Sequence, residues 1–151
     1  MKYVLTVLSL IIFSCSNTTS EAKSDIESEP EVQKVIDTFF NKYKEGSPSD
    51  AIDYIFGTNQ SFMPEQIAEL KNKLTTATLA TGNFNGTELI TTKKTSDSLI
   101  FYSYLVKHDK QPLRFTFIFY KPKDKWVLYK FKFDDQVDAE LEESGRIYFI
   151  K

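Results

Sequence analysis

Aromatic residues at every second position of the second half constrain the fold more than any other feature of this chain. In the run 114–120, Phe115, Phe117 and Phe119 alternate with Arg, Thr, Ile and Tyr. Successive side chains of a strand point to opposite faces, so these three rings should share one face of a sheet. Similar β-rich runs cover 87–93, 98–107, 113–121 and 126–133 and are separated by short polar turns. The pattern predicts antiparallel strands joined by hairpins.

Alternation also predicts which residues share a face of this sheet. One face should hold Tyr102, Tyr104, Val106, Phe115, Phe117, Phe119, Val127, Tyr129, Phe131 and Phe133. The other should hold Leu99, Phe101, Thr116, Ile118, Tyr120, Trp126 and Leu128. This second face is more apolar than a solvent-facing surface normally is. Either the C-terminal segment covers it, or Phe101, Ile118, Tyr120, Trp126 and Leu128 form an interface with a partner or a second copy.

The first half of the domain has the periodicity of helices. Apolar residues recur at helical spacing, and a Gly or Pro marks each boundary. The first stripe is Val32, Val35, Ile36, Phe39, Phe40 and Tyr43; the second is Ala51, Ile52, Ile55 and Phe56; the third is Ile67, Leu70, Leu74 and Ala77. We therefore expect an α+β domain, with three N-terminal helices packed on an antiparallel sheet of four to five strands. After the sheet, Val137 and Leu141 suggest a short acidic helix, and 146–150 a final strand.

The N-terminus is built like a secretory signal. Lys2 precedes the apolar stretch 4–13, which is too short to span a bilayer, since a spanning helix needs roughly twenty residues. Ile12, Phe13 and Ser14 then precede Cys15, the only cysteine of the chain. This run resembles the lipobox of bacterial lipoproteins, although the bulky Phe13 departs from it. The resemblance implies a signal peptide 1–14 and lipid attachment at Cys15; a non-lipidated signal peptide cut near Ser14 or Ser16 is the alternative.

The segment 15–30 is rich in Ser, Thr, Asn and Glu, which is typical of a flexible tether because it cannot bury enough apolar surface to fold. A single folded domain is expected over 31–151. Without another cysteine, this domain has no thiol chemistry or thiolate metal site. The lipoprotein resemblance places the protein in the cell envelope, and Ser16 after the cysteine favours the outer membrane.

The order of three helices followed by a meander resembles the nuclear transport factor 2-like superfamily, whose fold is cone-shaped and related to that of cystatins. The resemblance covers 31–133 and includes the aromatic strand 125–133 that follows a tight turn. It implies a small apolar ligand held between helices and sheet. The residues expected to line that pocket are Phe39, Tyr43, Tyr102, Tyr104, Phe115 and Phe117. It also implies dimers formed through the outer sheet face.

Catalytic and cofactor motifs are lacking in the sequence. His108, the only histidine, is expected to be a solvated residue of a polar turn, and no nucleophile elbow or phosphate-binding loop is present. We therefore predict no catalytic residues, no metal and no cofactor. The net charge of −2 and the solvent-facing lysines of 121–132 argue against a nucleic-acid partner.

These features together predict a membrane-anchored envelope lipoprotein. It would act as a non-enzymatic binding or accessory module, with a small apolar ligand or an envelope protein as its partner, and a homodimer is a further option. The alternative is a small isomerase or dehydratase acting on an apolar molecule. That enzyme would need an open pocket with a buried carboxylate beside one of the tyrosines.

Overall fold

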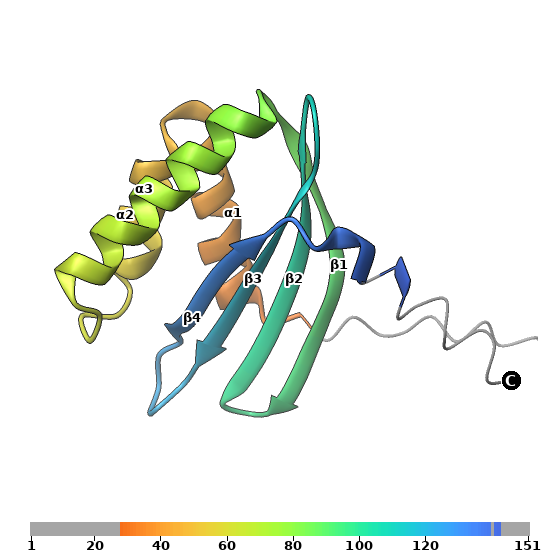
Figure 1. Cartoon of the computed structure of the whole chain (residues 1–151). Coiled ribbons are helices and arrows are strands. Elements are labelled where there is room, and N and C mark those ends of the chain that lie inside the picture. The colour runs from red at the N-terminus through yellow and green to blue at the C-terminus, as the bar shows by residue number, and fades with distance from the viewer. Residues whose placement is uncertain (1–27, 140, 143–151) are drawn as a thin grey trace, which may run out of the picture.

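A computed structural model describes residues 28–139 and 141–142 of the chain. Cys15, the predicted signal peptide 1–14 and the predicted strand 146–150 lie outside the described residues. The helices are α1 (Pro30–Glu45), α2 (Pro48–Phe56) and α3 (Pro64–Thr81). The strands are β1 (Phe84–Ser96), β2 (Leu99–His108), β3 (Leu113–Tyr120) and β4 (Val127–Asp134) (Figure 1). The prediction of an α+β domain with helices before an antiparallel sheet is confirmed.

The helices begin where the sequence changes from polar turns to apolar stripes. Pro30, Pro48 and Pro64 each open a helix, where the fixed φ of proline fits and its missing N–H is not needed. The Ser47 hydroxyl also accepts a hydrogen bond from the Asp50 N–H at 3.1 Å, which caps α2. The predicted stripe of α1 is buried at Val32, Ile36, Phe39, Phe40 and Tyr43. In α1 and α2 the proline at the start and the buried apolar face therefore agree.

The sheet is a meander in which each strand pairs with its sequence neighbour, in the order β1-β2-β3-β4. All three pairings are antiparallel, and the sheet is open, with β1 and β4 at its edges. The helices cover one face (Figure 1). On that face the Phe39 ring lies 5.2 Å from Phe117 and 5.5 Å from Phe131. The core is therefore a layer of rings between α1 and the middle of the sheet.

The predicted alternation is wrong at the start of β4. The register pairs Ile118 with Lys130 but Phe119 with Leu128, so Tyr129 is an extra residue, a β-bulge. Consequently Leu128 is fully buried on the helix-covered face, whereas Tyr129 is 60 % exposed. Trp126, two residues before Leu128, belongs to the same buried cluster. Leu128 and Trp126 are core residues and do not line the outer face, which Val127 joins instead beside Tyr120.

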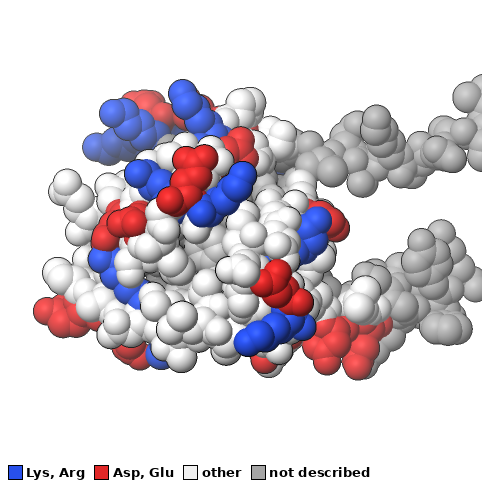
Figure 2. Space-filling view, turned by 90° about the horizontal axis from the view of Figure 1, so that it is seen from above, with Lys and Arg blue, Asp and Glu red and all other residues white. Residues whose placement is uncertain are grey.

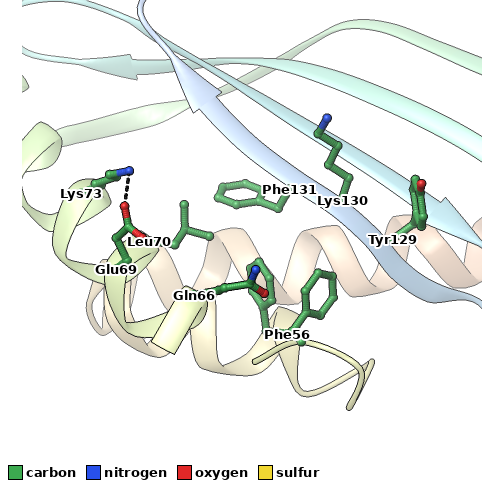
Figure 3. A pocket seen from close by; sticks show the side chains of 9 residues that line it. Phe56, Gln66, Glu69, Leu70, Lys73, Tyr129, Lys130 and Phe131 are labelled. Atoms are coloured by element: carbon green, nitrogen blue, oxygen red, sulfur yellow. Dashed lines mark ion pairs between the residues drawn. The ribbon is translucent and has the colours of Figure 1, made fainter. Parts of the chain in front are cut away.

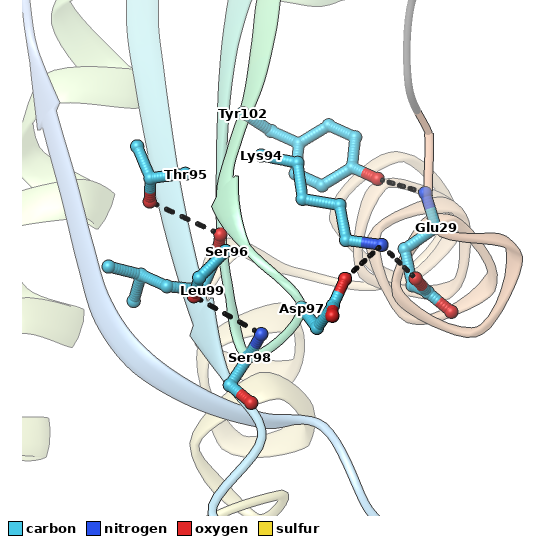
Figure 4. A network of polar contacts seen from close by, with 8 residues as sticks. All are labelled: Glu29, Lys94, Thr95, Ser96, Asp97, Ser98, Leu99 and Tyr102. Atoms are coloured by element: carbon cyan, nitrogen blue, oxygen red, sulfur yellow. Dashed lines mark hydrogen bonds and ion pairs between the residues drawn. The ribbon is translucent and has the colours of Figure 1, made fainter.

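The entry of the chain into the domain is tied to the sheet (Figure 4). The Glu29 N–H donates to the Tyr102 hydroxyl at 2.9 Å. The Lys94 ammonium lies 3.6 Å from the Glu29 carboxylate and 3.9 Å from that of Asp97. These contacts tie the residue that precedes α1 to β1 and β2.

The end of β4 is held by a paired charge. The Arg114 guanidinium contacts the Asp134 carboxylate through two nitrogens, each at 3.0 Å, across neighbouring strands. Residues 137–139 and 141–142 are helical, as the acidic pattern predicts, and Leu141 is exposed. Among the described residues, no helix combines the length and the apolarity that crossing a membrane requires.

Candidate functional site

The six residues predicted to line a pocket are brought together as mutually packed core side chains. Phe39, Tyr102, Phe115 and Phe117 are fully buried, and Tyr43 and Tyr104 nearly so. The Phe39 ring is 6.2 Å from both Tyr43 and Phe115, and Tyr104 is 6.0 Å from Phe117. At such centroid distances aromatic rings are in contact. The rings therefore occupy the space between α1 and the sheet that the ligand was expected to fill.

The tyrosine hydroxyls of this cluster are bound to the protein itself. Tyr104 accepts a hydrogen bond from the Gln33 side-chain amide at 3.0 Å, and burial raises the pKa of Tyr104 to about 12. Burial likewise raises the pKa of Tyr102, whose hydroxyl oxygen accepts the Glu29 N–H. A raised pKa keeps each phenol neutral at physiological pH. These hydroxyls connect α1 to β2 and serve the packing of the domain.

His108 is not the solvated turn residue that the sequence suggested. It is the last residue of β2 and only 8 % exposed. Its Nε2 lies 3.0 Å from the Tyr43 hydroxyl, which also bonds Thr78 at 2.9 Å. Burial lowers the pKa of His108, and the Val106 carbonyl and the Asp109 carboxylate offset this only in part. Its Nδ1 makes no hydrogen bond to the described residues.

The sequence did contain a signal for this histidine. Ile100, Tyr102, Tyr104 and Val106 are buried members of β2, and His108 continues their alternation. Because the residues from Asp109 on are polar, the sequence pattern assigns His108 to the turn that follows the strand. The imidazole joins helix α1, helix α3 and strand β2 through its contact with Tyr43. Its position thus links three elements of the fold, and no carboxylate accompanies it as a hydrogen-bond partner within the described chain.

The outer face of the sheet is apolar at one end only. We call that end the outer patch and define it by Leu99, Phe101, Ile118, Tyr120 and Val127. Leu99 and Tyr120 are 36 % and 43 % exposed and line a shallow pocket of about 370 Å³ with Ser96 and Tyr129. In the middle of the face, Ser103 pairs with Thr116, and both are small and buried. The far end carries ion pairs, Arg114 with Asp134 and Lys107 with Glu88.

A second recess, which the sequence pattern did not reveal, lies between α3 and β4. It holds about 250 Å³ and is lined by Phe56, Phe62, Gln66, Glu69, Leu70, Lys73, Tyr129, Lys130 and Phe131 (Figure 3). A further hollow continues it along Asn72, Lys73, Thr76, Ala77, Ala80 and Phe133. We call the two together the α3–β4 groove. Its sequence signal was the weak apolar stripe of α3, in which only Leu74 of the four predicted residues is fully buried.

Positive and negative charges are mixed on one face of the molecule. Seen from above, Lys and Arg side chains alternate with Asp and Glu side chains over the visible face (Figure 2). Among residues 28–139 and 141–142, no group of three His, Cys, Asp or Glu side chains could hold a metal ion. Comparison of the chain with protein-family models, with curated proteins and with solved structures finds no match. The outer patch and the α3–β4 groove are therefore the two candidate sites of this domain.

Proposed function

We propose that this protein is an envelope lipoprotein, anchored through Cys15, that binds another envelope protein through the outer patch and catalyses no reaction. The observation that carries this proposal is the exposure of Leu99 and Tyr120 beside one shallow pocket. Exposed apolar side chains that lie together, rimmed by polar residues, are typical of protein-binding surfaces. The anchor would present this patch at a membrane surface.

The nuclear transport factor 2-like resemblance agrees with this use of the outer face. Members of that superfamily dimerise through the outer faces of their sheets, so a second copy is the main competing occupant. The feature on which that resemblance rests is the order of three helices followed by an antiparallel meander. A cone-shaped, ligand-holding interior has less support, because rings of α1 and β3 pack directly against each other. The same packing disfavours the isomerase or dehydratase alternative, which needs open space beside a tyrosine.

Anchoring is tested by metabolic labelling with a fatty-acid analogue in a bacterial host. The intact chain should incorporate label and fractionate with membranes, and the Cys15→Ser variant should lose both properties. Label that persists in Cys15→Ser would contradict attachment at this residue. Secretion of an unlabelled, shortened chain would instead support the ordinary signal peptide cut near Ser14 or Ser16.

The binding role is tested by photocrosslinking in intact cells. A photoreactive phenylalanine analogue replaces Tyr120 in the outer patch and, as the matched control, Leu79, which is 78 % exposed on α3. Crosslinks to a distinct protein from position 120 only are the expected result. A crosslinked product of twice the chain mass would assign the patch to a homodimer. Equal labelling from both positions would contradict a specific role for the patch.

A further inference from the structure

We propose that the α3–β4 groove binds an extended peptide segment of a partner protein, which adds as a strand to the free edge of β4. The segment would carry apolar side chains at alternate positions and acidic side chains between them. Strand addition draws its affinity from main-chain hydrogen bonds and its specificity from pockets for alternate side chains. The groove meets the pocket of the outer patch at Tyr129, which lines both. Its other walls come from α3 and from the edge of β4, so the inference does not depend on the function proposed above.

The edge of β4 is protected at its beginning. The Asn59 side-chain amide donates to the Leu128 carbonyl at 2.8 Å, and the Leu128 N–H donates to the Thr58 hydroxyl at 3.2 Å. Both polar groups of Leu128 thus point away from β3 and are satisfied by the loop after α2. Such capping prevents another strand from pairing at this point.

Further along, the same edge is left open. The N–H and C=O of Leu128 point away from β3, so Leu128 and Phe119 form a non-hydrogen-bonded pair. The next pair along the two strands, Ile118 with Lys130, is therefore a hydrogen-bonded pair. Hydrogen-bonding direction alternates along the strand, so the N–H and C=O of Phe131 and Phe133 face outward. Within the described chain, no side chain or loop bonds these groups. Two residues therefore offer donors and acceptors to an incoming strand.

The groove supplies pockets beside this open edge. Leu70 of α3 and Phe131 of β4 both line the recess (Figure 3). Phe56 and Phe62 line it too, and their rings are in contact with each other. Its α3 wall runs from Gln66 to Ala80, which is roughly 21 Å at the helical rise per residue. That length matches about six residues of extended chain. Alternate apolar side chains of the peptide would fill the recess.

Charge complementarity specifies the other side of the peptide. Lys130 and Lys132 are exposed members of β4 whose partners, Ile118 and Thr116, lie on the outer face. Residues of an added strand that point to that face would stand directly beside these ammonium groups, where opposite charges are favourable. The one carboxylate that lines the groove, Glu69, is paired with Lys73 at 2.6 Å. An acidic residue at alternate positions of the peptide is therefore the best match.

The occupant is a partner rather than the tail of the same molecule. After Asp134 the described residues lead away from β4 toward the side of β1 (Figure 1). A strand supplied by the same chain would have to return across the sheet. Pairing between the β4 edges of two copies is the remaining competitor, and it would place Lys130 and Lys132 of both copies close together. Such like-charge neighbours are unfavourable.

The test uses the full-length chain in detergent micelles and a fluorescent hexapeptide of alternating Val and Glu, with binding followed by fluorescence anisotropy. A peptide of alternating Val and Lys is the charge control. We expect the Glu peptide to bind at least about tenfold more tightly than the Lys peptide. Thr76→Trp, which fills the groove, should abolish binding, whereas Leu79→Trp on the exposed side of α3 should not. Circular dichroism establishes that both variants are folded.

Two further measurements distinguish binding in the groove from binding elsewhere on the domain. Lys130→Glu with Lys132→Glu should reverse the peptide preference, and Lys123→Glu with Lys125→Glu, of equal charge change in the neighbouring turn, should not. Amide NMR shifts should concentrate at Phe131 and Phe133. Binding that is lost in Tyr120→Lys but kept in Thr76→Trp would overturn the proposal in favour of the outer patch. Absence of binding at about 1 mM peptide, or a concentration-dependent dimer that excludes the peptide, would also overturn it.

Discussion

The two faces of the sheet are made from the same four strands and differ in what covers them. On the helix-covered face, Phe115, Phe117 and Phe119 of β3 are fully buried. On the outer face of the same strand, Ile118 is half-buried and Tyr120 is 43 % exposed. Both faces carry large apolar side chains, yet the helices α1 to α3 pack on only one of them. Apolar alternation therefore defines two surfaces, and a separate feature, the stripe of α1, decides which becomes the core.

The strongest test of this difference is truncation of one large side chain on each side of the sheet. Phe39→Ala removes a ring that contacts Phe115, Phe117 and Phe131, so it should lower the free energy of unfolding by about 3–5 kcal/mol. Tyr120→Ala on the outer face should cost less than about 1 kcal/mol. Urea unfolding of both variants measures the difference. Equal losses would show that the outer face is covered as fully as the inner one.

The bulge at Tyr129 gives a sharper test within one strand. Leu128→Ala should cost about 2–5 kcal/mol, because Leu128 is fully buried. Val127→Ala, one residue earlier on the outer face, should cost clearly less. The alternation read from the sequence predicts the reverse order. Chemical denaturation of the two variants therefore decides the register of β4.

His108 makes the covered face sensitive to pH. Because burial lowers the pKa of His108 in the folded state, the unfolded chain binds the proton more readily. Stability should be constant above the ordinary histidine pKa of 6.5 and should fall as the pH drops below it. The His108→Gln variant should lack this loss. Urea midpoints measured from about pH 7.5 to about pH 5 check the prediction, and an unchanged slope in the variant would contradict it.

The smallest change in the free energy of unfolding is expected at the hydrogen bond between Glu29 and Tyr102. Tyr102→Phe removes the acceptor of the Glu29 N–H, a part-buried hydrogen bond, and should cost about 0.5–1.5 kcal/mol. Hydrogen exchange at the Glu29 amide should increase more than that at the Ile36 amide. Equal protection in the variant and the parent chain would mean that this hydrogen bond does not hold the junction.

Most of the fold was accessible from sequence because periodicity, caps and turns agree in it. The stripe of α1 and the alternation of β2 and β3 predict the core correctly at Phe39, Tyr102 and Phe117. The errors are the register of β4 and the burial of His108. The residues before the bulge, Lys125, Trp126 and Val127, carry no pattern that predicts it. The bulge lies next to Leu128, whose carbonyl accepts a hydrogen bond from Asn59 in the distant loop after α2. Burial of His108 depends on Tyr43, which is distant in sequence.

The α3–β4 groove was the least predictable feature. Four apolar positions on α3 imply a fully packed helix, yet Ile67, Leu70 and Ala77 are only partly buried, because α3 packs mainly on α2. The distance between α3 and the edge of the sheet depends on the angle between them, which the preceding turn sets. The spacing of apolar residues in one sequence does not predict that angle. The residues of the outer face, by contrast, follow the predicted alternation except at the start of β4, where Val127 replaces Trp126 and Leu128.

The nearest-neighbour order of the strands has a consequence for how fast the domain forms. Each pairing of the meander joins consecutive strands, so each step closes only a short loop and costs little chain entropy. Topologies dominated by such local pairings cross lower folding barriers than sheets that must bring distant segments together. The sheet can therefore assemble progressively from β1 to β4 as the polypeptide is released. The aromatic strands of the folding chain would therefore spend little time unpaired.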